Sequence, residues 1–295
     1  MSVCARLTTS RPSPTSPGVP VSSPAPAASF WKTFWEKGGW WRALLLTAVY
    51  FALFQLLSLV FTPLAEQVQD PAGTAGVAVF YLLPEIIGAV ILALFTLSVG
   101  WWRELFARQP IRGRGWMWIA IVVVLLFNIL RFATIDYGAV GVDVVLTWLL
   151  TGLLIGLTEE VLTRGLVVTL MRKAGYREIV VAVISATLFS LLHAGNLLSG
   201  QPLLTTAIQV LYTFAFGILM YLALRVTGTL IAPILLHAST DPSIFLQSAY
   251  PADGALTAFA AFGNIAVIIT GFVLIFFIRG RVGDAQPSFS ETRPA

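Results

Sequence analysis

The chain of 295 residues has only two histidines, His193 and His237, and both lie inside long apolar segments. A third apolar segment carries the adjacent glutamates Glu159 and Glu160, with Arg164 one helical turn later. An ionisable side chain in the hydrocarbon of a membrane costs about 3 kcal/mol or more, so such residues usually mark a functional site. Carboxylates and imidazoles are also the groups that activate water and transfer protons. The sequence therefore predicts one buried polar centre suited to acid–base chemistry.

The spacing of these residues indicates how they face one another. Glu160 and Arg164 are four residues apart, so they lie on one side of a helix, and we expect Glu160 to be ionised and held by Arg164. Glu159 points about 100° around the same helix and is left free to act on something else. His237 and Asp241 are also four apart. We expect Asp241 either to orient the imidazole or to accept its proton.

Composition places the chain among membrane proteins that cross the bilayer several times. It is 57% hydrophobic and only 11% charged, with a mean hydropathy of +0.86. A membrane-spanning helix needs about 20 mostly apolar residues. We predict an all-α polytopic fold of about eight transmembrane helices around a polar catalytic centre. The predicted spans are 40–61, 77–99, 116–135, 143–170, 179–195, 205–224, 229–247 and 256–278.

Two features of these spans lead to further expectations. Pro233 and Pro242 fall inside 229–247, so we expect this helix to be kinked or broken near the site. Counting about 1.5 Å per residue from the cytoplasmic ends places both glutamates and both histidines roughly 18 to 24 Å deep, in one layer of the bilayer.

Other polar residues inside the spans have structural interpretations. We expect Glu85 and Arg131 to form an ion pair between the second and third spans, with a substrate path as the alternative role. We expect Asn128 and Gln209 to form interhelical hydrogen bonds.

The distribution of cations explains the net charge of +4 without a nucleic-acid partner. Thirteen of the 18 Lys and Arg residues lie in alternate connections or flanks of the spans, and the other four connections contain none. Because positively charged loops stay in the cytoplasm, we predict a multi-pass protein of the cell membrane with both termini inside.

The spans also suggest an organisation for the chain. Residues 1–29, which include the only cysteine, Cys4, form a Pro- and Ser-rich tail that we expect to be disordered and cytoplasmic. The first three spans occupy 30–142, the catalytic core 143–250, the last span 251–279 and a flexible tail 280–295.

Three short motifs occur in order, each on a predicted span. They are Glu159-Glu160-Val161-Leu162-Thr163-Arg164, Phe189-Ser190-Leu191-Leu192-His193 and His237-Ala238-Ser239-Thr240-Asp241. In this pattern, residues 143–245 resemble the CAAX-protease and bacteriocin-processing (CPBP) family of intramembrane endopeptidases, also called the abortive-infection family.

The resemblance implies a role for each motif residue. Glu159 would be the general base that activates water, assisted by His193, while Glu160 and Arg164 would hold the site in shape. His237 and Asp241 would stabilise the oxyanion. An ionised Asp241 cannot donate a hydrogen bond, so it would have to be protonated or instead orient His237.

The family has also been viewed as metal-dependent. Glu159, His193 and His237 are chemically suitable zinc ligands, with water in the fourth position. The sequence has no His-Glu-x-x-His pair. We favour a Glu/His mechanism without a metal, and a zinc metalloprotease stays open as the alternative.

These observations predict an intramembrane endopeptidase whose partners are membrane lipids and a membrane-anchored or lipid-modified protein or peptide substrate. Two other functions remain possible from the same residues. In a proton-coupled transporter the buried groups would relay protons. In a non-catalytic membrane scaffold they would have only a structural role.

Overall fold

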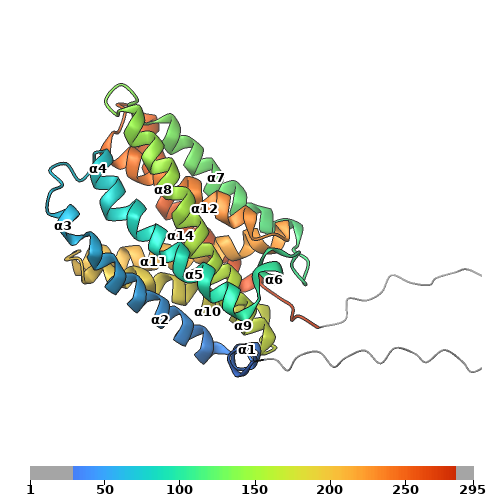
Figure 1. The fold of residues 1–295 in the computed structure, drawn as a ribbon. Helices are drawn as coiled ribbons and strands as arrows, with labels where there is room; N and C mark the ends of the chain where they lie inside the picture. The colour runs from blue at the N-terminus through green and yellow to red at the C-terminus, as the bar shows by residue number, and fades with distance from the viewer. Residues whose placement is uncertain (1–28, 284–295) are drawn as a thin grey trace, which may run out of the picture.

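The computed structural model describes residues 29–283, which form a bundle of roughly aligned helices (Figure 1). Within these residues, seven helical segments are long and apolar enough to cross a membrane, which confirms the predicted all-α polytopic fold. They are Trp40–Ala65, Thr74–Val99, Gly115–Ala133, Val142–Lys173, Glu178–Leu197, Leu203–Thr227 and Ala255–Phe277. Most of the two predicted tails, including Cys4, lies outside the described residues.

Several of the segments combine α-helix with shorter pieces of other helix types. The α-helices of the first half are α1 (Phe30–Glu36), α2 (Trp40–Ser58), α3 (Thr62–Ala65), α4 (Thr74–Val77), α5 (Leu83–Val99), α6 (Trp102–Phe106) and α7 (Trp118–Ala133). Those of the second half are α8 (Val142–Glu160), α9 (Val168–Lys173), α10 (Glu178–His193), α11 (Leu203–Thr227), α12 (Ile231–Ala249), α13 (Ala255–Ala261) and α14 (Gly263–Leu274). Two π-helical segments are inserted, Ala78–Leu82 before α5 and Val161–Val167 between α8 and α9.

The remaining predicted span, 229–247, is present as helix α12, which has 19 residues. It is less apolar than the other seven because it carries His237, Asp241 and Gln247. The predicted break is wrong, since the helix continues through Pro242. Pro242 packs directly on α8, where a Cβ added to Gly152 would lie 2.3 Å from its ring. Close packing against a neighbouring helix therefore maintains a helix that local sequence alone disfavours.

Helix α11 is the most deeply packed of the seven segments. In its most apolar stretch 61% of the residues are buried, and the helix contacts α7, α10, α12 and α14. It therefore packs against α10 and α12, two of the helices that carry the motifs.

Both ends of the described chain lie at the same end of the bundle (Figure 1). The N–H of Gly39 donates to the carbonyl of Leu170 at 2.8 Å, and that of Glu178 donates to the carbonyl of Gly280 at 2.9 Å. The buried Glu178 carboxylate also accepts from Arg172 and Arg225, at 2.7 and 2.9 Å. A cationic network thus joins the ends of α9, α10 and α11.

The predicted interhelical hydrogen bonds of Asn128 and Gln209 are confirmed. The Asn128 amide on α7 donates to the hydroxyls of Ser239 and Thr240 on α12, both at 2.9 Å. Gln209 on α11 accepts from Asn196, just beyond α10, at 2.9 Å. These bonds fix the relative heights of the helices.

The predicted ion pair between Glu85 and Arg131 is wrong. Glu85 on α5 instead accepts from the hydroxyl of Thr158 on α8 at 2.5 Å, and Arg131 on α7 donates to Asn264 on α14 at 2.8 Å. Helix α5 packs on α8, α8 on α12, and α12 on α7, so two helices separate the residues. Similar depth in the membrane does not place them side by side.

Candidate active site

The two glutamates lie where α8 changes into the π-helical segment Val161–Val167. Glu160 is fully buried and its Oε1 is 3.0 Å from Nη1 of Arg164, so the spacing of four residues forms the expected ion pair. The carbonyl of Thr163 accepts a hydrogen bond from the Ser185 hydroxyl of α10 at 2.9 Å. The π-helical segment therefore ties the glutamates to the helix that ends in His193. Such segments occur often at functional sites.

His237 on α12 lies between the two glutamates. Its Nδ1 is 2.8 Å from Oε1 of Glu160, and its Nε2 is 3.5 Å from Oε2 of Glu159. A carboxylate can only accept, so the short contact requires Nδ1 to carry the proton and donate to Glu160. The imidazole is thereby held in one orientation, with Nε2 directed at Glu159.

Glu159 has the freedom that its position on the helix predicts. Its side chain is 20% exposed, and among the described residues its one ionic contact is His237 at 3.5 Å. Glu160, by contrast, is fully buried and holds both Arg164 and His237. The adjacent carboxylates therefore differ in environment, with one fixed and the other open to a bound water or substrate.

Asp241 makes no hydrogen bond to His237. Its Oδ2 lies 3.9 Å from Nε2 of His237, beyond hydrogen-bond distance, and its side chain is 24% exposed. The hydrogen bond through which Asp241 was expected to orient the ring is therefore not formed, and Glu160 holds the ring through Nδ1 instead. Asp241 lies instead at the open edge of the site.

His193 joins the site through an aromatic ring. The Phe189 ring is 4.9 Å from the His193 ring and 5.8 Å from the His237 ring, and the Arg164 guanidinium lies over it at 4.5 Å. Nδ1 of His193 is 3.1 Å from the Phe189 carbonyl, which can only accept. In the neutral ring, the lone pair is then on Nε2. Both histidines and Arg164 are thus arranged around one phenyl ring.

Two glycines on α8 allow α12 to approach closely enough for these contacts. A Cβ on Gly156 would lie 2.6 Å from the Ile234 carbonyl oxygen and 2.8 Å from the Ala238 nitrogen. A Cβ on Gly152 would lie 2.5 Å from the Ala238 carbonyl oxygen. This pair was not among the residues predicted for the site, although small residues four apart are a known signal for close helix packing in membranes.

Glu85 adds a fourth carboxylate near the site. The Thr158 hydroxyl that it binds belongs to the residue just before Glu159. Glu85 is buried, on the helix that packs against α8. The alternative to the ion pair, in which Glu85 lines a substrate path, is compatible with this position.

The possible zinc ligands Glu159, His193 and His237 do not form a metal-binding group as they stand. Among residues 29–283, no three His, Cys, Asp or Glu side chains are grouped closely enough to hold one ion. The donor set is chemically suitable, and the hydrogen bond of Nδ1 to Glu160 leaves Nε2 of His237 free to bind an ion. Because the three side chains are not grouped around one point, we assign no step to a metal.

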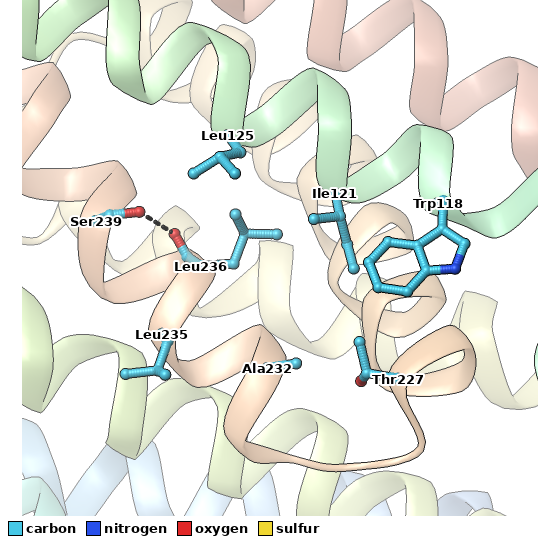
Figure 2. A pocket seen from close by; sticks show the side chains of 8 residues that line it. All are labelled: Trp118, Ile121, Leu125, Thr227, Ala232, Leu235, Leu236 and Ser239. Carbon is cyan, nitrogen blue, oxygen red and sulfur yellow. Dashed lines mark hydrogen bonds between the residues drawn. The ribbon is translucent and has the colours of Figure 1, made fainter.

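A separate groove of about 300 Å³ lies between α7 and α12 (Figure 2). Its lining is mostly apolar and includes Trp118, Ile121 and Leu125 of α7 and Leu235, Leu236 and Ser239 of α12. The Ser239 hydroxyl there donates to the Leu236 carbonyl at 2.8 Å. None of the motif glutamates or histidines lines this groove, so it lies on a different face of α12 from His237.

A match to a known protein family covers the part of the chain that contains the site residues. Residues 141–242 match the family model described as type II CAAX prenyl endopeptidase Rce1-like, which represents CPBP proteins. The resemblance to CPBP proteins is therefore supported over this segment. The match contains all three motifs and all six candidate site residues. No curated protein and no solved structure matches the chain. The similarity of this segment to the family model indicates a protease of the CAAX type.

Replacement of Gly156 by alanine should disrupt the site without removing any reacting group. The new Cβ would meet backbone atoms of α12, so the helices must separate and His237 must move away from Glu159 and Glu160. Misplacement of reacting groups by about 1 Å costs roughly a hundredfold in rate, so we expect Gly156→Ala to lose activity on this scale. The measurement is cleavage of a membrane-tethered peptide by protein in nanodiscs.

Gly115→Ala is the matched control, because a Cβ at Gly115 would have no other atom within 4 Å. It should retain full activity and thermal stability. Unchanged cleavage by the Gly156→Ala protein would contradict the role assigned to this close approach.

Proposed function

We propose that the protein is an intramembrane endopeptidase that hydrolyses a peptide bond of a membrane-associated or lipid-modified protein with a water activated by Glu159. The observation that carries this proposal is the contrast between the two glutamates. Glu160 is committed to Arg164 and His237, whereas Glu159 is partly open and lies 3.5 Å from Nε2 of His237. A free carboxylate beside an oriented imidazole is suited to proton transfer.

In this mechanism Glu159 takes a proton from the attacking water, and the lone pair on Nε2 of His193 helps to orient that water. The water oxygen bonds to the carbonyl carbon of the substrate and the carbonyl oxygen becomes an oxyanion. Nε2–H of a positively charged His237 donates to the oxyanion, which lowers the energy of the tetrahedral intermediate. The C–N bond then breaks, and Glu159 returns its proton to the leaving amine.

The charges of the site are compatible with these roles. Within the group of four that contact one another, Glu159 and Glu160 carry two negative charges and Arg164 and a protonated His237 carry two positive charges, with Asp241 and Glu85 at the edge of the group. A balanced cluster is far less costly in a low-dielectric interior than an unpaired charge. Arg164 and Phe189 contact the reacting groups from behind, so we assign them positioning roles. We assign Asp241 no bond to the oxyanion, but it lies close enough to the open edge to contact substrate.

Loss of the general base should remove most of the catalytic rate. General-base catalysis contributes about a hundredfold to ten-thousandfold, so we expect Glu159→Gln to lower kcat by at least a hundredfold. Cleavage of a panel of membrane-tethered peptides in detergent or nanodiscs measures this. Glu66→Gln, which changes an exposed carboxylate outside the site, should leave cleavage unaltered. Equal cleavage by the Glu159→Gln and wild-type proteins would reject Glu159 as the base.

We further propose that catalysis proceeds without a bound zinc ion. Purified active protein should then contain much less than one zinc per chain by mass spectrometry, and dialysis against 1,10-phenanthroline should not lower its rate. A stoichiometric zinc content, together with a loss of activity that added zinc restores, would support the metalloprotease alternative instead.

For localisation, we propose the cell membrane with both termini in the cytoplasm. The shared position of the described ends and the cationic network beside them support this orientation. Because Cys4 is the only cysteine, a membrane-impermeant maleimide should label it only after spheroplasts are permeabilised. A Cys4→Ser protein that also carries Leu198→Cys should be labelled in intact spheroplasts, because Leu198 is 75% exposed in a loop at the opposite end. The reverse pattern would invert the orientation.

A further inference from the structure

Hydrogen bonding fixes only one edge of the His237 ring. Its Nδ1 is 2.8 Å from Oε1 of Glu160, but its Nε2 is 3.5 Å from Oε2 of Glu159, which is longer than a normal N–H···O hydrogen bond. A histidine ring turns about a broad, two-fold torsion, so the side chain has little preferred orientation of its own. A half turn would exchange both nitrogens with ring carbons. Packing against the ring must therefore help to hold it.

Phe216 of α11 supplies that packing. Its ring lies 4.9 Å from the His237 ring with 74° between the planes, and is nearer than the Phe189 ring of α10 at 5.8 Å. The two phenyl rings are 6.3 Å apart, so all three rings pack on one another. Edge-to-face packing at such distances is favoured between aromatic rings. Phe216 and His237 are each only 2% exposed, so this cluster restricts rotation of the imidazole.

The Phe216 ring is itself held in place. Tyr212, four residues earlier on α11, stacks on it at 5.9 Å with 15° between the planes. The next residue, Gly217, lies directly against Arg164. A Cβ there would be 2.9 Å from Nη2 of Arg164 and 3.0 Å from the backbone of α10. The missing side chain lets α11 lie close to α10, which brings Phe216 within reach of His237.

The other side of α11 provides a matched comparison. Phe214, two residues before Phe216, packs on Phe272 of α14 at 5.5 Å, and within residues 29–283 its ring contacts none of the motif rings. Residues two apart on a helix point about 200° apart, so the two phenyl rings lie on different sides of α11. The same substitution at either position removes one aromatic contact of one helix, but only at Phe216 does it touch the site.

We propose that Phe216 is a positioning residue, which holds His237 with Nδ1 on Glu160 and Nε2 directed into the site. Helix α11 carries none of the three motifs, so this role adds a fourth helix to those that arrange the reacting groups. The effect on catalysis rests on the proposed endopeptidase function, in which His237 donates to the oxyanion. The orientation of the ring does not rest on that function.

The first test is spectroscopic and needs no substrate. The full chain, purified without a histidine tag, contains only two histidines, so labelling with 13C,15N-histidine gives two ring spin systems in lipid bilayers. A His193→Gln protein assigns the remaining signals to His237. The measurement is the proton signal of Nδ1–H, which a carboxylate acceptor shifts downfield.

Wild-type and Phe214→Leu proteins should show one sharp downfield Nδ1–H signal from His237. In Phe216→Leu protein this signal should disappear or split, because the ring then adopts more than one orientation. Phe216→Met refills more of the space without a planar ring and should show a smaller change of the same kind. If Phe216→Leu does not fold, as judged by gel filtration and thermal denaturation, Phe216→Met serves for the comparison.

The second test measures cleavage of a membrane-tethered peptide in nanodiscs. Displacement of a reacting group by about 1 Å costs roughly a hundredfold in rate, so we expect Phe216→Leu to lower kcat by about tenfold or more. KM should change little, because the oxyanion that His237 stabilises is absent from the bound substrate. Phe214→Leu should keep both kcat and KM.

An unchanged Nδ1–H signal in Phe216→Leu protein would overturn the proposal, and so would an equal change in Phe214→Leu protein. A wild-type protein without the downfield signal would also overturn it. In an active enzyme, an unaltered kcat or a rise in KM alone would reject the positioning role. Failure of the proposed function would appear differently, as equal cleavage by wild-type and Glu159→Gln protein, and would leave the spectroscopic result unaffected.

Discussion

A single oxygen atom, Oε1 of Glu160, connects the parts of the site. It lies 3.0 Å from Arg164 and 2.8 Å from His237, inside a fully buried side chain. A buried carboxylate costs several kcal/mol of desolvation, and contact with opposite charge offsets that cost only when the geometry is good. The ring of His237 is therefore held in one orientation, and Nε2 is left facing Glu159. The close packing of α8 on α12 and the aromatic contacts of Phe189 maintain this arrangement.

The sequence predicted the parts of the molecule that local rules determine. Seven of the eight expected spans were confirmed, because a crossing needs about 20 apolar residues and this signal is strong. The pairing of Glu160 with Arg164 followed from the helical repeat. The contact of Glu160 with His237 could not be predicted, since the residues are 77 positions apart and depth alone does not give the side that a residue faces. The four-residue spacing of Gly152 and Gly156 can be read from the sequence, but it does not show which helix packs on them.

The incorrect expectations share one physical cause, which is competition from tertiary contacts. Asp241 has the right spacing to orient His237, yet Glu160 of another helix is closer to the ring. Glu85 and Arg131 have opposite charges at similar depth, yet α8 and α12 separate them. Pro242 disfavours helix locally, yet packing on α8 maintains α12 through that position. In each case a local rule applied, but a contact between distant segments had a larger effect.

The polarity of α12 has a consequence for how the protein is made. Asp at the centre of a transmembrane helix costs about 3 kcal/mol during insertion by the translocon, and α12 also carries His237 and Gln247. On its own, this helix is therefore inserted into the membrane unfavourably. It enters the bilayer favourably only when α7 offers Asn128 and α8 offers its glycine face, and both precede it in the chain. Biogenesis of this helix and assembly of the catalytic residues are consequently one cooperative event.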